Sequence, residues 1–457
     1  MTSPALPLFV AVLAIGAAAQ ASSQTDSYAI VDVTVIDVEN GIAIPGQTVV
    51  VVDDHIEWMG PVDDVAMPKG ASILDGRGLF LMPGLVDAHV HYFDRETFGR
   101  LFVANGVTLV RDTGMANELV LPLRADLESR ALLGPELRTA GTMLDGAPPL
   151  IPTIALGVAT PEDAGAAVHR QAAAGVDFIK VYSRLDADVF LAIVEEAHAL
   201  GLKVIGHVPD SITIEAAAAA GLDESEHFFG FDKLVGRLLG APVKSTYAGM
   251  GSDVGYFLRL GELDPAVLRA ALDGLRTSGL TVCPTVVTFK MGTQTRAFQS
   301  GVFPGSEFVS QTVLDTWRTL WAGQNDLPPF VWQTWANLVV ELHKAGIPLM
   351  VGTDLSVPGI LPGFAVHDEM AIWQDAGIPA ADVLRSATLV PAEFLGMGDL
   401  LGTIAAGKTA SMVLLRANPL EDVRNARETE AVFLRGQYFD RAALDRLLEE
   451  ARELAKR

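Results

Sequence analysis

The sequence has a single cysteine, Cys283, among its 457 residues. No disulfide bond can therefore form within the chain, even in an oxidising compartment, and stability must come from packing. Cys283 lies in the apolar run LTVCPTVV, where a buried, inert thiol is far more common than a nucleophile. This composition points away from a disulfide-stabilised protein and from a cysteine-dependent enzyme.

Basic residues are also scarce, with 33 Lys and Arg against 56 Asp and Glu and a formal net charge of -23. A surface of that sign repels phosphate backbones and anionic lipids, so nucleic acid is not expected as a partner. Because 50% of the residues are hydrophobic and only 19% are charged, the chain can bury a large core. We expect one large domain and a smaller one.

The apolar run from Leu6 to Ala19 is shorter than the roughly 20 residues that a membrane-spanning helix needs. It is followed by Ala19-Gln20-Ala21, the small-x-small pattern of a signal-peptidase site, although the first residues contain no Lys or Arg. We predict a signal peptide over residues 1–21, export to the periplasm or medium, and no stable membrane insertion after cleavage. The alternative is an uncleaved apolar leader or a short membrane anchor.

A pattern recurs through the middle of the chain: a helix-like stretch, a glycine, then a short β-branched run that ends in polar residues. It occurs in ANGVTLVRDTG, AAGVDFIKVYS, ALGLKVIGHV, AAGLDESEHF, TSGLTVCPTV and KAGIPLMVGTD. The glycine suits the left-handed end of a helix, and the run after it has strand composition. Each unit is therefore read as a helix followed by a strand.

Two further apolar runs, GLVDAHVH and ELRTAGTML, bring the expected number of strands to eight. Amphipathic helices such as DADVFLAIVEEAHAL fit between them. The predicted fold class is α/β, with a closed, TIM-like (β/α)₈ barrel over residues 83–395. An open doubly wound sheet is the alternative.

The two flanks have strand and turn character without helical periodicity. Neither flank could bury a core alone, so residues 28–82 and 396–440 are expected to form one small β-sandwich. A final amphipathic helix is expected over residues 441–457.

Two stretches exceed normal loop length, from Phe228 to about Asp264 and from Thr288 to Gln333. In or beside the second lie four of the six tryptophans, Trp317, Trp321, Trp332 and Trp335. These side chains would pack inserted helices on the barrel, or form an apolar wall over the active site. The sequence leaves both readings open.

The motif VDAHVH provides the first candidate metal ligands, His89 and His91. A strand's period of two places both imidazoles on one face, where they can bind the same metal. The other candidates stand at the predicted carboxyl ends of different strands. They are Lys180 after FI, His207 after KVIG, His227 after DESE and Asp354 after LMVGT. In a barrel these ends converge on the active-site face.

A lysine at a barrel mouth loses hydration, which lowers its pKa and lets the neutral amine react with carbon dioxide. The resulting carbamate on Lys180 could bridge two cations. Alternatively, Lys180 could pair with a carboxylate such as Asp354. Asp354 itself can bind a cation and accept a proton from metal-bound water, leaving a bridging hydroxide as nucleophile.

Several other polar residues are candidates for lesser roles. Tyr182, two residues beyond Lys180, should face the same barrel mouth, where its hydroxyl would either bind the substrate carbonyl or merely pack. Arg111 and Arg184 would hold a substrate carboxylate or be solvated. His367 is expected either to begin a helix or to support a ligand.

Together these segments resemble the amidohydrolase superfamily, in its imidazolonepropionase-like and prolidase-like branch. The resemblance covers nearly the whole chain after the leader, including FLMPGLVDAHVH, FIKVYS, ESEHFFG, GIPLMVGTD and LGTIAAGKTASMVLLRANPLEDV. It implies two divalent metal ions, usually zinc, and a carbamate formed from carbon dioxide on the lysine. By similarity the ligand roles fall on His89, His91, Lys180, His207, His227 and Asp354.

The predicted function is metal-dependent hydrolysis of a C–N bond in a small molecule, such as a dipeptide or an N-acyl amino acid. The bridging hydroxide would attack the carbonyl while Asp354 passes the proton to the leaving nitrogen. The alternatives are a lactone or ester hydrolase, a mononuclear deaminase, and a non-catalytic binding protein on the same scaffold. Substrate, metal identity and homo-oligomerisation are left open.

Overall fold

A computed structural model of the chain describes residues 27–64, 69–241, 256, 259–355 and 357–457. The predicted signal peptide and its cleavage site lie outside these residues, as does much of the first long insertion. None of the helices within the described ranges combines the length and the apolar character needed to cross a membrane.

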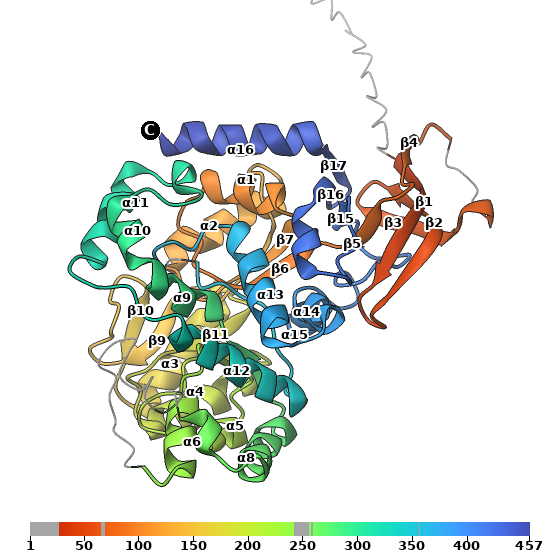
Figure 1. The fold of residues 1–457 in the computed structure, drawn as a ribbon. Helices are drawn as coiled ribbons and strands as arrows, with labels where there is room; N and C mark the ends of the chain where they lie inside the picture. The colour runs from red at the N-terminus through yellow and green to blue at the C-terminus, as the bar shows by residue number, and fades with distance from the viewer. Residues whose placement is uncertain (1–26, 65–68, 242–255, 257–258, 356) are drawn as a thin grey trace, which may run out of the picture.

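Strands from both ends of the chain pair in one eight-stranded sheet, ordered β17-β16-β15-β5-β1-β2-β3 with β4 against β1. Its strands are β1 (Ser27–Asp37), β2 (Ile42–Val52), β3 (His55–Pro61), β4 (Ser72–Asp75), β5 (Phe80–Pro83), β15 (Met412–Leu415), β16 (Thr429–Leu434) and β17 (Gln437–Asp440). The antiparallel pair β5–β15, with Leu81 opposite Leu414, joins the two ends. Figure 1 shows this sheet to one side of the helical body. The two-layer sandwich and the exact domain limits stay predictions.

Parallel strands alternating with helices make up the body. One sheet contains β6 (Leu85–Val90), β7 (Val107–Asp112) and β8 (Glu136–Thr139). The other has the order β10-β9-β11-β12-β13-β14, and its strands are β9 (Met143–Gly146), β10 (Ala155–Val158), β11 (Phe178–Val181), β12 (Lys203–Gly206), β13 (Glu224–Glu226) and β14 (Thr281–Cys283). The intervening helices are α1 (Thr97–Ala104), α2 (Asn117–Glu128), α3 (Pro161–Ala174), α4 (Ala187–Ala199), α5 (Ile214–Ala220) and α8 (Pro265–Thr277). The α/β class is thereby established.

Backbone hydrogen bonds link the two parallel sheets. Asp177 N donates to Thr139 O at 2.9 Å beside β8, and Ala88 N in β6 donates to Val351 O, also at 2.9 Å. The segment LMVGTD, expected as a full strand, instead forms only isolated bridges at Leu349 and Leu355. Pro348 precedes it and offers a carbonyl but no N–H, which interrupts a regular ladder. Closure of all strands into one eight-stranded barrel stays a prediction.

Further helices cover the body and carry its insertions. They are α6 (Phe231–Leu238), α9 (Val286–Met291), α10 (Thr295–Ser300), α11 (Gln311–Leu320), α12 (Phe330–Lys344), α13 (Phe364–Ala376), α14 (Ala380–Ser386), α15 (Leu389–Phe394) and α16 (Arg441–Ala455). The last helix, α16, begins where the Asp440 carboxylate accepts a hydrogen bond from Ala443 N at 2.7 Å. It lies across α1 (Figure 1).

Candidate metal centre

The two histidines of VDAHVH converge on one carboxylate. His89 lies in β6 and is fully buried, and His91 follows the end of that strand. Their Nε2 atoms lie 3.3 and 3.5 Å from the same oxygen, Asp354 Oδ1. Asp354 is held there by its backbone N–H, which donates to His89 O at 2.8 Å, and it adopts a left-handed φ of 56°. The structure thus brings together three residues that are far apart in sequence.

The other two histidines follow β12 and β13 directly. The His207 ring is stacked between two aromatic rings, with centroid distances of 4.1 Å to Tyr182 and 3.8 Å to Phe229. His227 Nε2 lies 3.8 Å from Asp354 Oδ2, and its ring centroid is 4.5 Å from that of His89. All four histidines predicted as ligands therefore lie around one centre.

Three of these rings are oriented through Nδ1. His91 Nδ1 lies 2.7 Å from Gly114 O, and because a carbonyl only accepts, Nδ1 carries the proton there. The other two rings contact hydroxyl groups in the same way. His207 Nδ1 lies 2.9 Å from Ser183 Oγ, and His227 Nδ1 lies 2.6 Å from Thr285 Oγ1. In this tautomer each Nε2 keeps a lone pair for a metal ion.

Lys180, in β11, is almost fully buried and forms an ion pair with Glu226. The partner considered from the sequence was Asp354, so Glu226 is a site residue that the sequence analysis missed. Glu226 Oε1 also lies 3.4 Å from His89 Nδ1. The signal was present in DESEH, because strand alternation places Glu224 and Glu226 on one face.

Arg111 is fully buried, and neither role expected from the sequence applies to it. Its guanidinium lies 3.0 Å from Glu224 Oε1 and 3.8 Å from Glu226 Oε1, so it serves protein carboxylates. Arg184 is exposed and donates to Pro148 O at 3.2 Å. His367, in α13, faces Asn105 O at 3.0 Å through Nε2 and lies outside the ligand cluster.

The electrostatic environment favours an ionised Asp354 and the neutral forms of most of the other candidate ligands. The exception is His91, whose pKa is raised because the contact with Asp354 outweighs the effect of burial. Burial lowers the pKa of Lys180 to about 7 and that of His227 to about 4. Burial likewise holds the pKa values of His89 and His207 well below the usual range. Burial alone would raise the pKa of Asp354, but the nearby imidazoles of His227, His89 and His91 lower it well below its ordinary value.

Several buried polar atoms in this cluster lack hydrogen bonds. Both ring nitrogens of His89 and both carboxylate oxygens of Glu226 have no hydrogen-bond partner within the described part of the chain. Ligand atoms of His89, His91 and Asp354 lie within 4.8 Å of one another, as do those of His89, Glu226 and His227. Imidazole and carboxylate suit a borderline divalent cation such as zinc, so these residues fit a metal centre.

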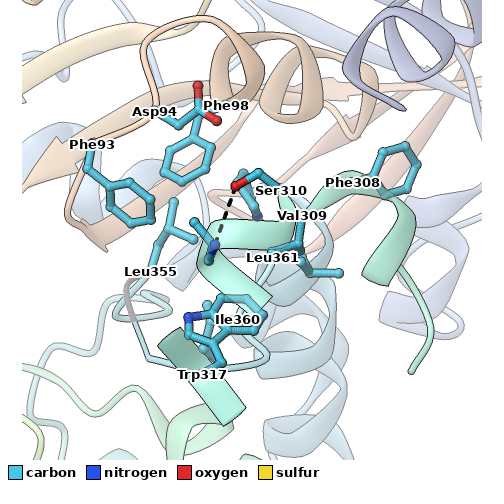
Figure 2. Close-up of a pocket in the computed structure, with 12 residues that line it drawn as sticks. Phe93, Asp94, Phe98, Phe308, Val309, Ser310, Trp317, Leu355, Ile360 and Leu361 are labelled. Carbon is cyan, nitrogen blue, oxygen red and sulfur yellow. Dashed lines mark hydrogen bonds between the residues drawn. The ribbon is translucent and has the colours of Figure 1, made fainter. Parts of the chain in front are cut away.

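A pocket is lined by residues that follow two of the candidate ligands, among them Phe93 after His91 and Leu355 after Asp354 (Figure 2). It is bounded by the segment after His91, by α11 and the residues before it, and by the segment that begins at Leu355. Among the four tryptophans, Trp317 lines this pocket, whereas Trp335 stacks on Phe289 at 4.2 Å. Trp335 therefore packs inserted helices together, and an apolar wall over the active site stays a prediction for Trp317.

Comparison with known proteins supports this interpretation. The model described as "Amidohydrolase family" matches residues 334–438. Imidazolonepropionase from Pseudomonas putida (strain GB-1) is 24% identical over 403 residues, 81% of this chain and 88% of the relative. A candidate prolidase from Bifidobacterium longum is 25% identical with a TM-score of 0.66, covering 93% of this chain and 99% of that one. Along most of its length the chain is thus similar to proteins of the amidohydrolase superfamily.

Another structure with this superfamily fold is a bottromycin amidohydrolase. It is 24% identical, has a TM-score of 0.73, and covers 94% of this chain and 90% of its own. These matches support a hydrolase that acts on carbon–nitrogen bonds.

Proposed function

We propose that this protein is a metal-dependent hydrolase that cleaves an amide bond in a dipeptide-like molecule or an N-acyl amino acid. The observation that carries the proposal is the convergence of four histidines, a lysine and an aspartate around unpartnered buried polar atoms. The proposal includes a closed (β/α)₈ barrel, because strand ends from all around such a barrel meet at one mouth.

The donor set would hold two ions. His89, His91 and Asp354 would hold one, and His207 and His227 would hold the second. Lys180, as a carbamate, would be a further ligand, since a lysine with a pKa of about 7 has a substantial neutral amine fraction at neutral pH. When bound, divalent ions supply Lewis acidity and lower the pKa of a coordinated water.

The protein side chains position the reactants and move the proton. Asp354 is ionised and close to three imidazoles. It accepts a proton from the attacking water and delivers that proton to the leaving nitrogen. The ring of Tyr182 packs on His207, and its hydroxyl donates a hydrogen bond to the substrate carbonyl oxygen as negative charge develops there. The hydrogen bonds to His Nδ1 atoms keep each imidazole in one orientation.

One observation favours a mononuclear deaminase as second candidate. Lys180 pairs with Glu226, and a lysine retained as an ion-pair partner would not be carbamylated. Ligand atoms of His89, His91 and Asp354 are already close enough for a single ion.

Metal stoichiometry and turnover together test the proposal. Purified protein should contain close to two divalent ions per chain, and chelation should abolish hydrolysis of a panel of dipeptides, N-acyl amino acids and lactones. One metal in a fully active enzyme would contradict the binuclear form. Turnover of lactones alone, or of aromatic amines by deamination, would contradict amide hydrolysis.

We also propose that the chain is exported, because its first residues combine an apolar run with Ala19-Gln20-Ala21. Intact-mass measurement of protein recovered from the periplasm or medium should give a mature N-terminus near Ser22. A chain that retains Met1 in the cytoplasm would refute export.

A further inference from the structure

The pocket of Figure 2 shares its wall with the segments that carry the candidate ligands. Leu355 lines it and directly follows Asp354, and Leu355 O accepts a hydrogen bond from His91 N at 3.0 Å. Phe93, two residues beyond His91, lines the same pocket. A group bound here would therefore lie next to the backbone that holds two predicted ligands.

The lining of this pocket is almost entirely apolar. Ten of its twelve lining residues are apolar: Phe93, Phe98, Phe308, Val309, Val313, Trp317, Leu355, Ile360, Leu361 and Pro362. Small-molecule sites have this kind of lining, mostly apolar with few polar groups.

The two polar side chains in the wall are engaged in capping helices. Asp94 Oδ1 accepts hydrogen bonds from Glu96 N at 3.1 Å and Thr97 N at 3.0 Å before α1. Ser310 Oγ accepts from Val313 N at 3.4 Å at the start of α11, as Figure 2 shows. No lysine, arginine or histidine is among the twelve lining residues, so the pocket offers nothing to pair with an anion.

We propose that this pocket is a specificity subsite for a bulky, uncharged apolar group of the substrate. The substrate class is then an amide with a large aliphatic or aromatic side chain beside the scissile bond. The inference rests on the proposed amide hydrolysis for its reaction, but the apolar binding site stands on its own geometry. Removing an apolar group from water favours binding here, whereas an anion would be desolvated with no cationic side chain among the lining residues.

Matched substrates measure this preference in the metal-loaded enzyme. Dipeptides and N-acetyl amino acids with Phe or Leu side chains should have kcat/KM values at least about tenfold above those of the Ala analogues. The Glu analogues should have values below those of Ala. Equal values for Phe, Ala and Glu substrates would overturn the subsite while leaving amide hydrolysis intact.

Variants that fill the pocket test whether the preference for apolar substrates arises there. Val313, half-buried on α11, lines the pocket, and Val313→Trp should lower the Phe-to-Ala selectivity ratio at least about tenfold. Thr316→Trp places the same ring on the exposed side of that helix and should keep the wild-type ratio. Val309→Phe fills the pocket from the segment before α11 and serves if the first variant does not fold. An unchanged ratio in a folded pocket-filling variant would contradict the assignment.

A binding measurement separates the subsite from the reaction. The neutral fluorophore N-phenyl-1-naphthylamine should bind the wild-type holoenzyme and Thr316→Trp, and bind Val313→Trp at least about tenfold more weakly. If the fluorophore behaves in this way but no amide is hydrolysed, the subsite holds and the proposed function fails. Equal binding to all three proteins would refute the subsite.

Discussion

Two buried acidic regions of the molecule differ in how their oxygens are used. In α13, Glu369 is fully buried and accepts hydrogen bonds from Val286 N at 2.9 Å, Val287 N at 2.6 Å and Trp373 Nε1 at 2.7 Å. In the ligand cluster, Glu226 is equally buried, but apart from its ion pair with Lys180 its oxygens accept no hydrogen bond from the described residues.

The contrast distinguishes a structural carboxylate from one available to a ligand. An unsatisfied buried polar group costs about 1–3 kcal/mol, so folded proteins rarely keep several together without a use for them. Around Glu369 the protein supplies every partner, which fixes α9 against α13. Around Glu226 the protein supplies only the Lys180 ion pair among the described residues, and bound metal ions would satisfy the ring nitrogens of His89 beside it.

The largest expected difference in turnover comes from replacing one carboxylate in each region by the amide of the same shape. Asp354→Asn removes the proposed proton acceptor, so turnover should fall about 10²- to 10⁴-fold with little loss of unfolding free energy. Glu369→Gln is the matched control. Its amide N–H atoms would face backbone donors, so it should lose about 1–3 kcal/mol of unfolding free energy and keep its turnover when folded. Urea denaturation and steady-state kinetics measure both, and the reverse pattern would undo the distinction.

Tyr182→Phe sharpens the comparison within the cluster. The ring that stacks on His207 at 4.1 Å remains, and only the hydroxyl is removed. Losing one such donor should lower turnover about 100- to 1000-fold while metal content and melting temperature stay the same. Wild-type turnover in a variant that retains its metals would mean that the tyrosine only packs.

Thr285→Val tests the support of a single ligand. It removes the hydroxyl that lies 2.6 Å from His227 Nδ1, so metal affinity should fall about 10- to 100-fold. Thr288→Val, in the neighbouring helix α9, removes only a hydroxyl that donates to Thr285 O and is the matched control. Competition with a chromophoric chelator gives both affinities, and equal values would remove Thr285 from the metal centre.

The smallest effect expected is the pH dependence of reactivation. The pKa of Lys180, lowered from 10.5 to about 7 by burial, makes the amine mostly neutral above pH 7 and mostly protonated below it. Because only the neutral amine forms a carbamate, apoprotein given Zn²⁺ should regain activity several-fold faster at pH 8 than at pH 6, at equal dissolved carbon dioxide. Omitting carbon dioxide should slow the pH 8 sample. Recovery rates independent of carbon dioxide would argue for an unmodified lysine.

The sequence predicted the positions of the site residues better than their contacts. Strand ends and the spacing in VDAHVH were sufficient to expect the cluster, and the structure places His89, His91 and Asp354 together. The pairing of Lys180 with Glu226 was missed because it spans from β11 across β12 to β13, and single-strand patterns specify neither the order nor the register of strands.

Two other differences between the sequence prediction and the structure also arise from tertiary contacts. Arg111 was expected at a strand end, yet its long side chain is buried against Glu224 from β13, a choice set by tertiary packing. The segment after Pro348 has strand composition, but its hydrogen bonds are shared among β14, β6 and Ser386 without a regular ladder. Local propensity predicted an extended backbone there and could not predict its partners.

The pairing of β5 with β15 also constrains the order of events during synthesis. As the chain emerges, β1 to β5 are complete long before β15 exists, so the β5 edge must wait for the last tenth of the polypeptide. An exposed strand edge is a template for wrong pairing, and contacts between distant segments form slowly. Shortening the chain before Met412 would leave that edge permanently open, so such fragments should aggregate even though every candidate metal ligand is still present.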